Sequence, residues 1–297
     1  MTRLTDRMAT IIMTLCVVLM VGTLISLLGY ILYHGLASIS WHFLTSHSSS
    51  FLAGGGIVDQ LWNSFYLLVL TLIISTPIGV SGGIFLAEYA KQNRVTAAIR
   101  TCVEVLSSLP SIVVGLFGML VFVNWFGWGF SILSGALALT VFNLPVIVRV
   151  SEDAIRSVPH AQKEAGLALG LTKWQTVWTI LLPSAFPGIL TGIILSAGRI
   201  FGESAALLFT AGLSSPELYF NDWNPTSPHS PLNPMRSAET LSVHIWAVNT
   251  QGIIPDVKQV ANGASAVLVI VVLIFNLGAR IIGSFIHARM QGKNSRA

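Results

Sequence analysis

The stretch Glu164-Ala165-Gly166-Leu167-Ala168-Leu169-Gly170 interrupts an otherwise apolar chain with charge, and after nine intervening residues Ile180-Leu181-Leu182-Pro183 follows. It predicts a short helix, a turn and a second helix. Gly170 suits the left-handed position that ends a helix, and Thr172 with Gln175 three residues later predicts a capping box for the next one. By itself the pattern is typical of any helix pair that joins two membrane spans. The second helix is expected to carry one apolar face made of Trp174, Val177, Trp178 and Leu181.

The spacing of this stretch also resembles the Glu-Ala-Ala loop of permease subunits in binding-protein-dependent ATP-binding-cassette (ABC) importers. In that family a glutamate, a glycine six residues later and an Ile-x-Leu-Pro closure recur at the distances seen here. Gly166 departs from the pattern, since a second alanine is usual there, but a small surface is kept and glycine weakens a helix by only about 1 kcal/mol. The resemblance implies that separate ATPase subunits dock on Glu164, Ala165, Gly166, Gly170, Trp174, Ile180, Leu182 and Pro183.

The composition excludes an ordinary soluble domain. Hydrophobic residues make up 53% of the chain and charged residues 9%, with a mean hydropathy of +0.75, whereas soluble domains carry about 25% charged residues. The net charge of +4 comes from bases scattered between apolar runs, which argues against a nucleic-acid partner. Cys16 and Cys102 lie far apart without metal-ligand spacing, so neither a disulfide framework nor a metal site is indicated. We therefore expect an all-α polytopic membrane protein in contact with membrane lipid.

Six apolar runs are long enough to cross a bilayer, which takes about 20 helical residues. They lie near 10–33, 62–87, 103–124, 130–150, 184–212 and 263–285. The first run lacks a small-residue cleavage site, so we expect a retained span and not a signal peptide. The prediction is one permease domain, 1–297, with a coupling loop at 151–183 and outward loops at 34–61 and 213–260.

The distribution of basic residues predicts the orientation, because Lys and Arg favour the cytoplasmic side. Only Arg236 and Lys258 fall on the opposite side, apart from Arg199 within a span. Both termini and the 151–183 loop are therefore expected in the cytoplasm. The bases on that side are Arg3, Arg7, Lys91, Arg94, Arg100, Arg149, Arg156, Lys163, Lys173, Arg280, Arg289, Lys293 and Arg296.

Three further segments leave alternatives open. In the third run Leu109-Pro110 predicts a kinked helix near a transport pathway, although ordinary packing explains the same residues. Gly54-Gly55-Gly56 has none of the lysine or serine context of a phosphate-binding loop and is read as a flexible connector. Residues 239–248 turn apolar again at helical spacing, which fits either a helix facing an outside partner or a helix lying on its own chain.

Arg199 is the candidate for the transport pathway. It lies about 16 residues after Pro183, which at roughly 1.5 Å per residue is about 24 Å along a helix and well inside the bilayer. A central arginine costs on the order of 3 kcal/mol and must face protein or water. Glu203 comes four residues later, so a continuous helix would place both on one face as an ion pair. Such a pair either serves the pathway together with Ser204 or merely makes the helix insertable.

Three runs resemble the PstA-type permease of bacterial phosphate importers: residues 197–211, 109–117 and 85–89. That family has six transmembrane helices of the ABC importer permease (MetI-like) type and sits in the bacterial inner membrane. The resemblance implies a homologous PstC-type permease, a PstB-type ATPase dimer and a periplasmic PstS-type phosphate-binding protein as partners. It also implies that phosphate passes by Arg199, Glu203 and Ser204.

No Gly-x-x-x-x-Gly-Lys-[Ser/Thr] motif occurs in the chain. We therefore expect a non-catalytic subunit that binds no cofactor itself, with ATP and Mg²⁺ on the partner ATPase. A permease for another oxyanion or small solute remains an alternative, and so does a membrane receptor or scaffold without transport. A membrane enzyme is the weakest alternative, because no nucleophile and base or metal-ligand spacing stands out.

Overall fold

The computed structural model describes residues 2–49, 53–252 and 254–290, so Lys293 and Arg296 lie outside the described residues. These parts of the chain are helical and contain no strand. Three π-helical turns extend helices: η1 (Phe85–Tyr89), η2 (Met119–Trp125) and η3 (Val177–Leu181). The α-helices are α1 (Thr2–Leu36), α2 (Trp41–Thr45), α3 (Val58–Ile84), α4 (Arg94–Ser108), α5 (Ser111–Gly118), α6 (Ile132–Arg156), α7 (His160–Ala168), α8 (Lys173–Thr176), α9 (Leu182–Gly202), α10 (Ala205–Leu208), α11 (Leu241–Gln251) and α12 (Val257–Met290).

Five continuous helices are long and apolar enough to cross a membrane: Asp6–Leu36, Val58–Tyr89, Ile132–Arg156, Lys173–Gly202 and Val257–Phe285. A sixth crossing is available if the bent pair Arg94–Ser108 and Ser111–Trp125 counts as one span. This agrees with an all-α protein of six spans.

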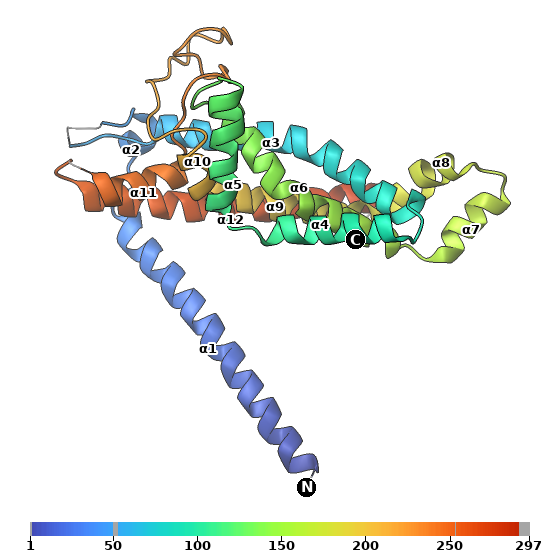
Figure 1. The fold of residues 1–297 in the computed structure, drawn as a ribbon. Helices are drawn as coiled ribbons and strands as arrows, with labels where there is room; N and C mark the ends of the chain where they lie inside the picture. The colour runs from blue at the N-terminus through green and yellow to red at the C-terminus, as the bar shows by residue number, and fades with distance from the viewer. Residues whose placement is uncertain (1, 50–52, 253, 291–297) are drawn as a thin grey trace.

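The helices form an elongated bundle in which α3, α6, α9 and α12 run side by side (Figure 1). We call one end the α7 end, because α7 and α8 project from it, and the other the α11 end, where α11, α2 and the 213–240 segment gather. The closest packing is between α3 and α6. A Cβ on Gly79 would lie 2.6 Å from Ile147, and one on Gly83 would lie 2.5 Å from Ser151. Only glycine lets these two helices approach so closely.

The third span is bent by 99° between α4 and α5. Leu109 leaves the helix with a ψ of 137°, because a residue before proline is pushed out of the α conformation. Figure 1 shows α4 running along the bundle and α5 lying across it. The predicted kink at Leu109-Pro110 is confirmed, and it is a sharp break.

The helix of the fifth span ends earlier in the chain than the sequence predicts. Its helix runs without interruption from Lys173 to Gly202 through η3, whereas the apolar run extends to residue 212. Glu203 is extended, with φ −76° and ψ 125°, and its carbonyl accepts a hydrogen bond from the Ser242 hydroxyl at 2.7 Å. The helix therefore ends where α11 offers its backbone another partner.

α1 stands apart from the rest of the bundle (Figure 1), and none of its most apolar window is buried. It meets the bundle at its last turn, where Gly35 packs against Asn262 and Ala266 of α12. From Ile11 to Tyr30 its apolar side chains are exposed.

α11 lies on its own chain. Leu241 and Val243 at its start are fully buried, and the helix packs against α12 and α3. Of the two interpretations of residues 239–248, the structure supports the helix that covers its own permease.

Candidate functional site

The turn between α7 and α8 has the local structure that the sequence predicts. Gly170 has a φ of +84°, a left-handed conformation that a residue with a Cβ rarely adopts. Thr172 and Gln175 form the predicted capping box: the Thr172 N–H donates to Gln175 Oε1 at 2.9 Å, and the Gln175 N–H donates to Thr172 Oγ1 at 3.3 Å. The two helices therefore meet in a defined turn.

The residues of the predicted apolar face of the second helix differ in exposure. Trp174 and Trp178 are 59% and 48% exposed, with ring centroids 5.4 Å apart, whereas Val177 and Leu181 are buried. The π-helical turn η3 begins at Val177, and its i→i+5 bonding changes the directions of the side chains that follow. The two tryptophans are left on the surface, while the aliphatic pair packs into the chain.

Gly166 also faces inward. A Cβ at this position would lie 2.6 Å from Ile180 Cδ1 and 3.2 Å from Thr176 Cγ2. The small size of Gly166 therefore lets α7 approach the α8–η3 segment, and it does not widen an exposed docking surface. The exposed residues of this unit include Glu164, Ala165, Leu167, Leu169, Trp174 and Trp178.

The Ile-x-Leu-Pro closure joins this unit to the membrane helix. Ile180 and Leu182 are half-buried, and Pro183 is exposed in the first turn of α9, directly after the π-helical turn η3. Since α8, η3 and α9 form one continuous helix, the turn at Gly170 is connected through that helix to the residues around Arg199.

Arg199 is exposed on α9. The carbon at the centre of its guanidinium lies 3.9 Å from the centroid of the Phe142 ring on α6, within the range of a cation–π interaction. The side chain borders a cavity of about 520 Å³ between α6, α9 and α12, whose other polar lining residues are Ser196 and Asn276. An exposed arginine in a membrane-crossing helix must face a water-filled space or another protein chain.

Glu203 and Ser204 do not continue the face of Arg199, so the predicted ion pair on one helical face is wrong. Because α9 ends at Gly202, the Glu203 carboxylate turns the other way and accepts from the Ala206 N–H at 3.2 Å. Ser204 precedes α10, and its carbonyl accepts from the Leu208 N–H at 3.0 Å. Within the residues that the structure describes, no ion pair joins Arg199 to Glu203.

Two of the three runs that resemble phosphate permeases meet at this break. A Cβ on Gly115 of α5 would lie 2.7 Å from the Cα of Ala206, and one on Gly118 would lie 2.8 Å from Thr210. The broken third span and the broken fifth span are therefore packed against each other. Interrupted helices of this kind expose backbone polar groups and are common where membrane transporters bind solutes.

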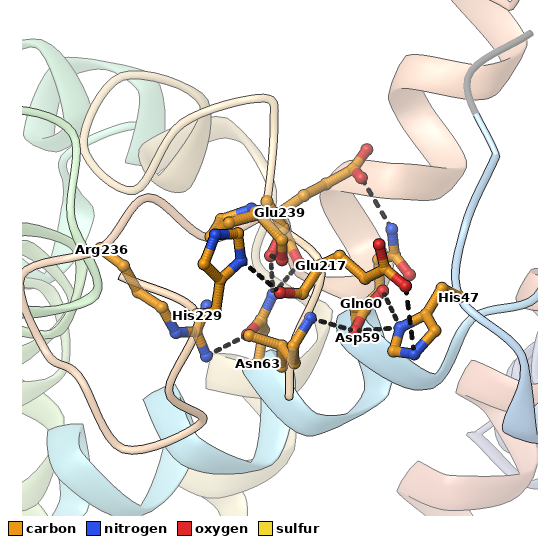
Figure 2. Close-up of polar contacts among 11 residues, drawn as sticks. His47, Asp59, Gln60, Asn63, Glu217, His229, Arg236 and Glu239 are labelled. Atoms are coloured by element: carbon orange, nitrogen blue, oxygen red, sulfur yellow. Dashed lines mark hydrogen bonds and ion pairs between the residues drawn. The ribbon is translucent and has the colours of Figure 1, made fainter. Parts of the chain in front are cut away.

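A polar cluster at the α11 end fixes the 213–240 segment to α3 (Figure 2). The buried Arg236 donates to Asn63 Oδ1 at 2.7 Å and to the Ser230 carbonyl at 3.0 Å. Glu239 accepts from Gln60 Nε2 at 2.9 Å and lies 3.1 Å from His244 Nδ1. Burial lowers the pKa of Arg236 to about 10, which leaves it cationic at neutral pH. The structure thus assigns Arg236 a structural contact that the sequence analysis did not predict.

Phe142 and Asn276 are neighbours of Arg199 that were not predicted from the sequence. Asn276 could have been noticed as the amide in an apolar run, whereas an aromatic residue such as Phe142 gives no signal in the sequence. Among the described residues, no three His, Cys, Asp or Glu side chains are grouped to hold a metal ion.

Comparison with known proteins identifies the class. Residues 79–292 match the family described as binding-protein-dependent transport system inner membrane component, and the chain belongs to that family. The probable ABC transporter permease protein YqgI of Bacillus subtilis (strain 168) is 60% identical over 288 residues, covering 97% of this chain and 98% of that protein.

Relatives with a named solute are more distant. The phosphate transport system permease protein PstA of Haemophilus influenzae is 32% identical over 251 residues, covering 83% of this chain and 82% of that protein. PstA of Xylella fastidiosa (strain 9a5c) is 40% identical over 177 residues, covering 60% and 62%.

Solved structures support the same fold. The bacterial alginate ABC transporter in complex with an alginate-bound periplasmic protein gives a TM-score of 0.67 at 17% identity, covering 95% of this chain and 96% of that chain. The MetNI methionine ABC transporter gives 0.55 at 19% identity, covering 77% and 93%. The chain is a multi-pass permease subunit of the ABC importer class.

Proposed function

We propose that this permease moves inorganic phosphate across the bacterial inner membrane. The observation that carries the proposal is the exposed Arg199 in a membrane-crossing helix, beside a cavity that also contains Ser196 and Asn276. The relatives named PstA support phosphate over other solutes. The likeness to methionine and alginate transporters, at 17–19% identity, concerns the fold alone.

Arg199 is suited to an oxyanion. Its guanidinium offers N–H donors in a fork that matches two phosphate oxygens. Contact with the Phe142 ring partly orients the guanidinium without neutralising it, because an aromatic ring carries no net charge. An arginine without a carboxylate partner retains its attraction for a passing anion. Glu203, being turned toward Ala206, serves the backbone at the break and not the anion.

We place the α7 end and both termini in the cytoplasm, as the distribution of basic residues predicts. ATP and Mg²⁺ would bind to a PstB-type ATPase dimer that docks on the exposed surface around Glu164, Leu169 and Trp174. The chain itself would perform no catalysis. A PstC-type permease would lie beside it, and a PstS-type binding protein would deliver phosphate at the α11 end.

The exposed apolar surface fits this assembly. The side chains of α1 cover nothing within the chain along most of its length, and an apolar helix in a membrane is covered by lipid or by another helix. We propose that membrane lipid and the second permease share this surface.

The alternative is a permease for another oxyanion or small solute. The test is uptake into liposomes that contain this chain with its second permease and ATPase, with the binding protein added outside. We expect ATP-dependent uptake of phosphate. At the same ionic strength, about a tenfold excess of sulfate should not inhibit this uptake. Uptake of sulfate or of an uncharged solute in preference to phosphate would support the alternative.

A further inference from the structure

Glu88 lies in the last turn of the α3–η1 helix, at the α7 end. Its carboxylate Oε2 lies 2.6 Å from the Lys163 ammonium of α7, and the Glu88 side chain is only 8% exposed. An acidic residue in the last turn of a helix is unfavourable, because the helix dipole places negative charge there. The carboxylate therefore depends on Lys163 for its stabilisation.

α8, the second helix of the α7–α8 pair, also contacts Glu88. Lys173, at the start of α8, donates from its ammonium to the Glu88 carbonyl and lies 4.8 Å from the centroid of the Tyr89 ring. Lys163 and Lys173 stand on opposite sides of the Gly170 turn. Glu88 is thus held by α7 through its side chain and by α8 through its backbone.

The carbonyl of Leu86, two residues before Glu88, accepts hydrogen bonds from two arginines. Arg100 of α4 and Arg156 of α6 each donate to the Leu86 carbonyl at 3.3 Å, and both guanidiniums pair with Glu152 at 2.9 and 3.0 Å. These bonds satisfy carbonyls that a helix end leaves without partners. They connect α3 to α4 and α6, whereas the contacts of Lys163 and Lys173 with Glu88 and Tyr89 connect the end of α3–η1 to α7 and α8.

Two neighbouring side chains on α7, those of Lys163 and Glu164, point in different directions. Glu164 is exposed, whereas Lys163, the residue before it, points to Glu88 on α3. α7 therefore presents Glu164 outward and fixes Lys163, the residue before it, to a membrane helix. The chain itself joins the α7–α8 pair to α6 through residues 157–159 and to α9 through η3, so a direct link to α3 requires a non-covalent contact of this kind.

We propose that Glu88 and Lys163 are positioning residues that fix α7 to the end of α3, so that movement of the docked turn reaches α3 as well as α9. Lys173 holds the same end through the backbone. This inference rests on the proposed function in one respect, that an ATPase docks on α7 and α8. Removing the ion pair would then uncouple ATP hydrolysis from transport without releasing the ATPase.

The first test is the number of ATP molecules hydrolysed per phosphate imported, measured in liposomes with the complete importer. Glu88→Gln and Lys163→Met should each raise this ratio several-fold, because ATP hydrolysis would continue while α3 no longer follows the docked turn. Lys163→Arg keeps the positive charge, so its ratio should equal that of the unmutated importer. Co-purification of the ATPase should be unchanged in all three variants.

Lys91→Met is the matched control, because Lys91 is an exposed lysine three residues after Glu88. It should leave the ratio unchanged. A normal ratio in both Glu88→Gln and Lys163→Met would overturn the proposal, and so would a Lys163→Arg variant as uncoupled as Lys163→Met.

The second test needs no solute. Spin labels at Gln92→Cys and Ala161→Cys, in the assembled complex with Cys16 and Cys102 replaced, report the distance between the end of α3 and α7. We expect a narrow distance distribution that Glu88→Gln broadens; an unchanged width would overturn the proposal. An unmutated importer that hydrolyses ATP but moves no phosphate would contradict the proposed function, and the label distance would still decide the role of Glu88.

Discussion

Arg199 and Phe142 are in contact across the α6–α9 interface, with the centre of the guanidinium 3.9 Å from the centroid of the ring. This contact takes the place of the ion pair with Glu203 that the sequence predicts. Since the ring holds the arginine without neutralising it, Arg199 keeps the positive charge that an anion pathway needs.

Replacing Phe142 by leucine should reduce transport without destroying the fold. A cation–π contact contributes about 0.5–2 kcal/mol, which corresponds to about a 2- to 30-fold loss when 1.36 kcal/mol is tenfold. Phosphate uptake at equal membrane levels is the measurement. Phe130→Leu, at an aromatic position 48% exposed, is the control and should transport normally. An unaffected Phe142→Leu variant would show that the ring does not orient Arg199.

The function of the protein should survive loss of the Glu203 charge, but its stability should fall when the side-chain oxygen that accepts from Ala206 is removed. Glu203→Gln can still accept from the Ala206 N–H, so uptake should stay within about twofold of the unmutated protein. Glu203→Ala removes a side-chain cap, which costs about 0.5–2 kcal/mol, and should lower thermal stability in detergent. If Glu203→Gln abolished uptake while Glu203→Ala left stability unchanged, the carboxylate would act on the solute instead.

Gly170 should be required for ATPase docking. With φ at +84°, a side chain there costs roughly 1–2 kcal/mol in backbone strain, and a bulky one would displace the turn. Gly170→Trp should insert into the membrane but lose co-purification with the ATPase. Gly127→Ala places the same kind of strain at φ +70°, away from the turn, and should keep the ATPase. The docking assignment fails if Gly170→Trp retains the partner and transports normally.

The topology can be tested with cysteine labels. A protein in which Cys16 and Cys102 are replaced should react at Pro225→Cys only from outside and at Leu169→Cys only from inside. Leu169 is 83% exposed at the α7 end, and Pro225 lies in the segment at the α11 end. Labelling of both positions from the same side would refute the proposed orientation.

Local signals in the sequence were sufficient for the spans and for the Gly170 turn. Apolar runs predict membrane helices because the bilayer demands them, and the Thr172–Gln175 box depends on residues three apart. The break at Leu109-Pro110 was predictable for the same reason, since proline restricts the residue before it.

The remaining features depend on contacts between distant segments. The apolar run continues past Gly202, and the helix stops there because Ser242 of α11 offers Glu203 a hydrogen bond, which no local pattern reveals. Likewise, Val177 is buried against residues of other helices whereas Trp174 is exposed, and their spacing in the sequence does not distinguish them. In the sequence, Glu88 looks like an ordinary polar residue at the end of a span. Its ion pair with Lys163 joins residues 75 positions apart and could not be predicted from local pattern.

The most direct test of the account is phosphate uptake by the complete importer at equal membrane levels of the unmutated chain, Arg199→Lys and Arg199→Gln. Lysine keeps the charge but not the fork, so Arg199→Lys should retain a fraction of uptake. Arg199→Gln should reduce uptake to background while ATPase co-purification remains normal. Near-normal phosphate uptake by Arg199→Gln would contradict the account, because the anion would then cross the membrane without this arginine.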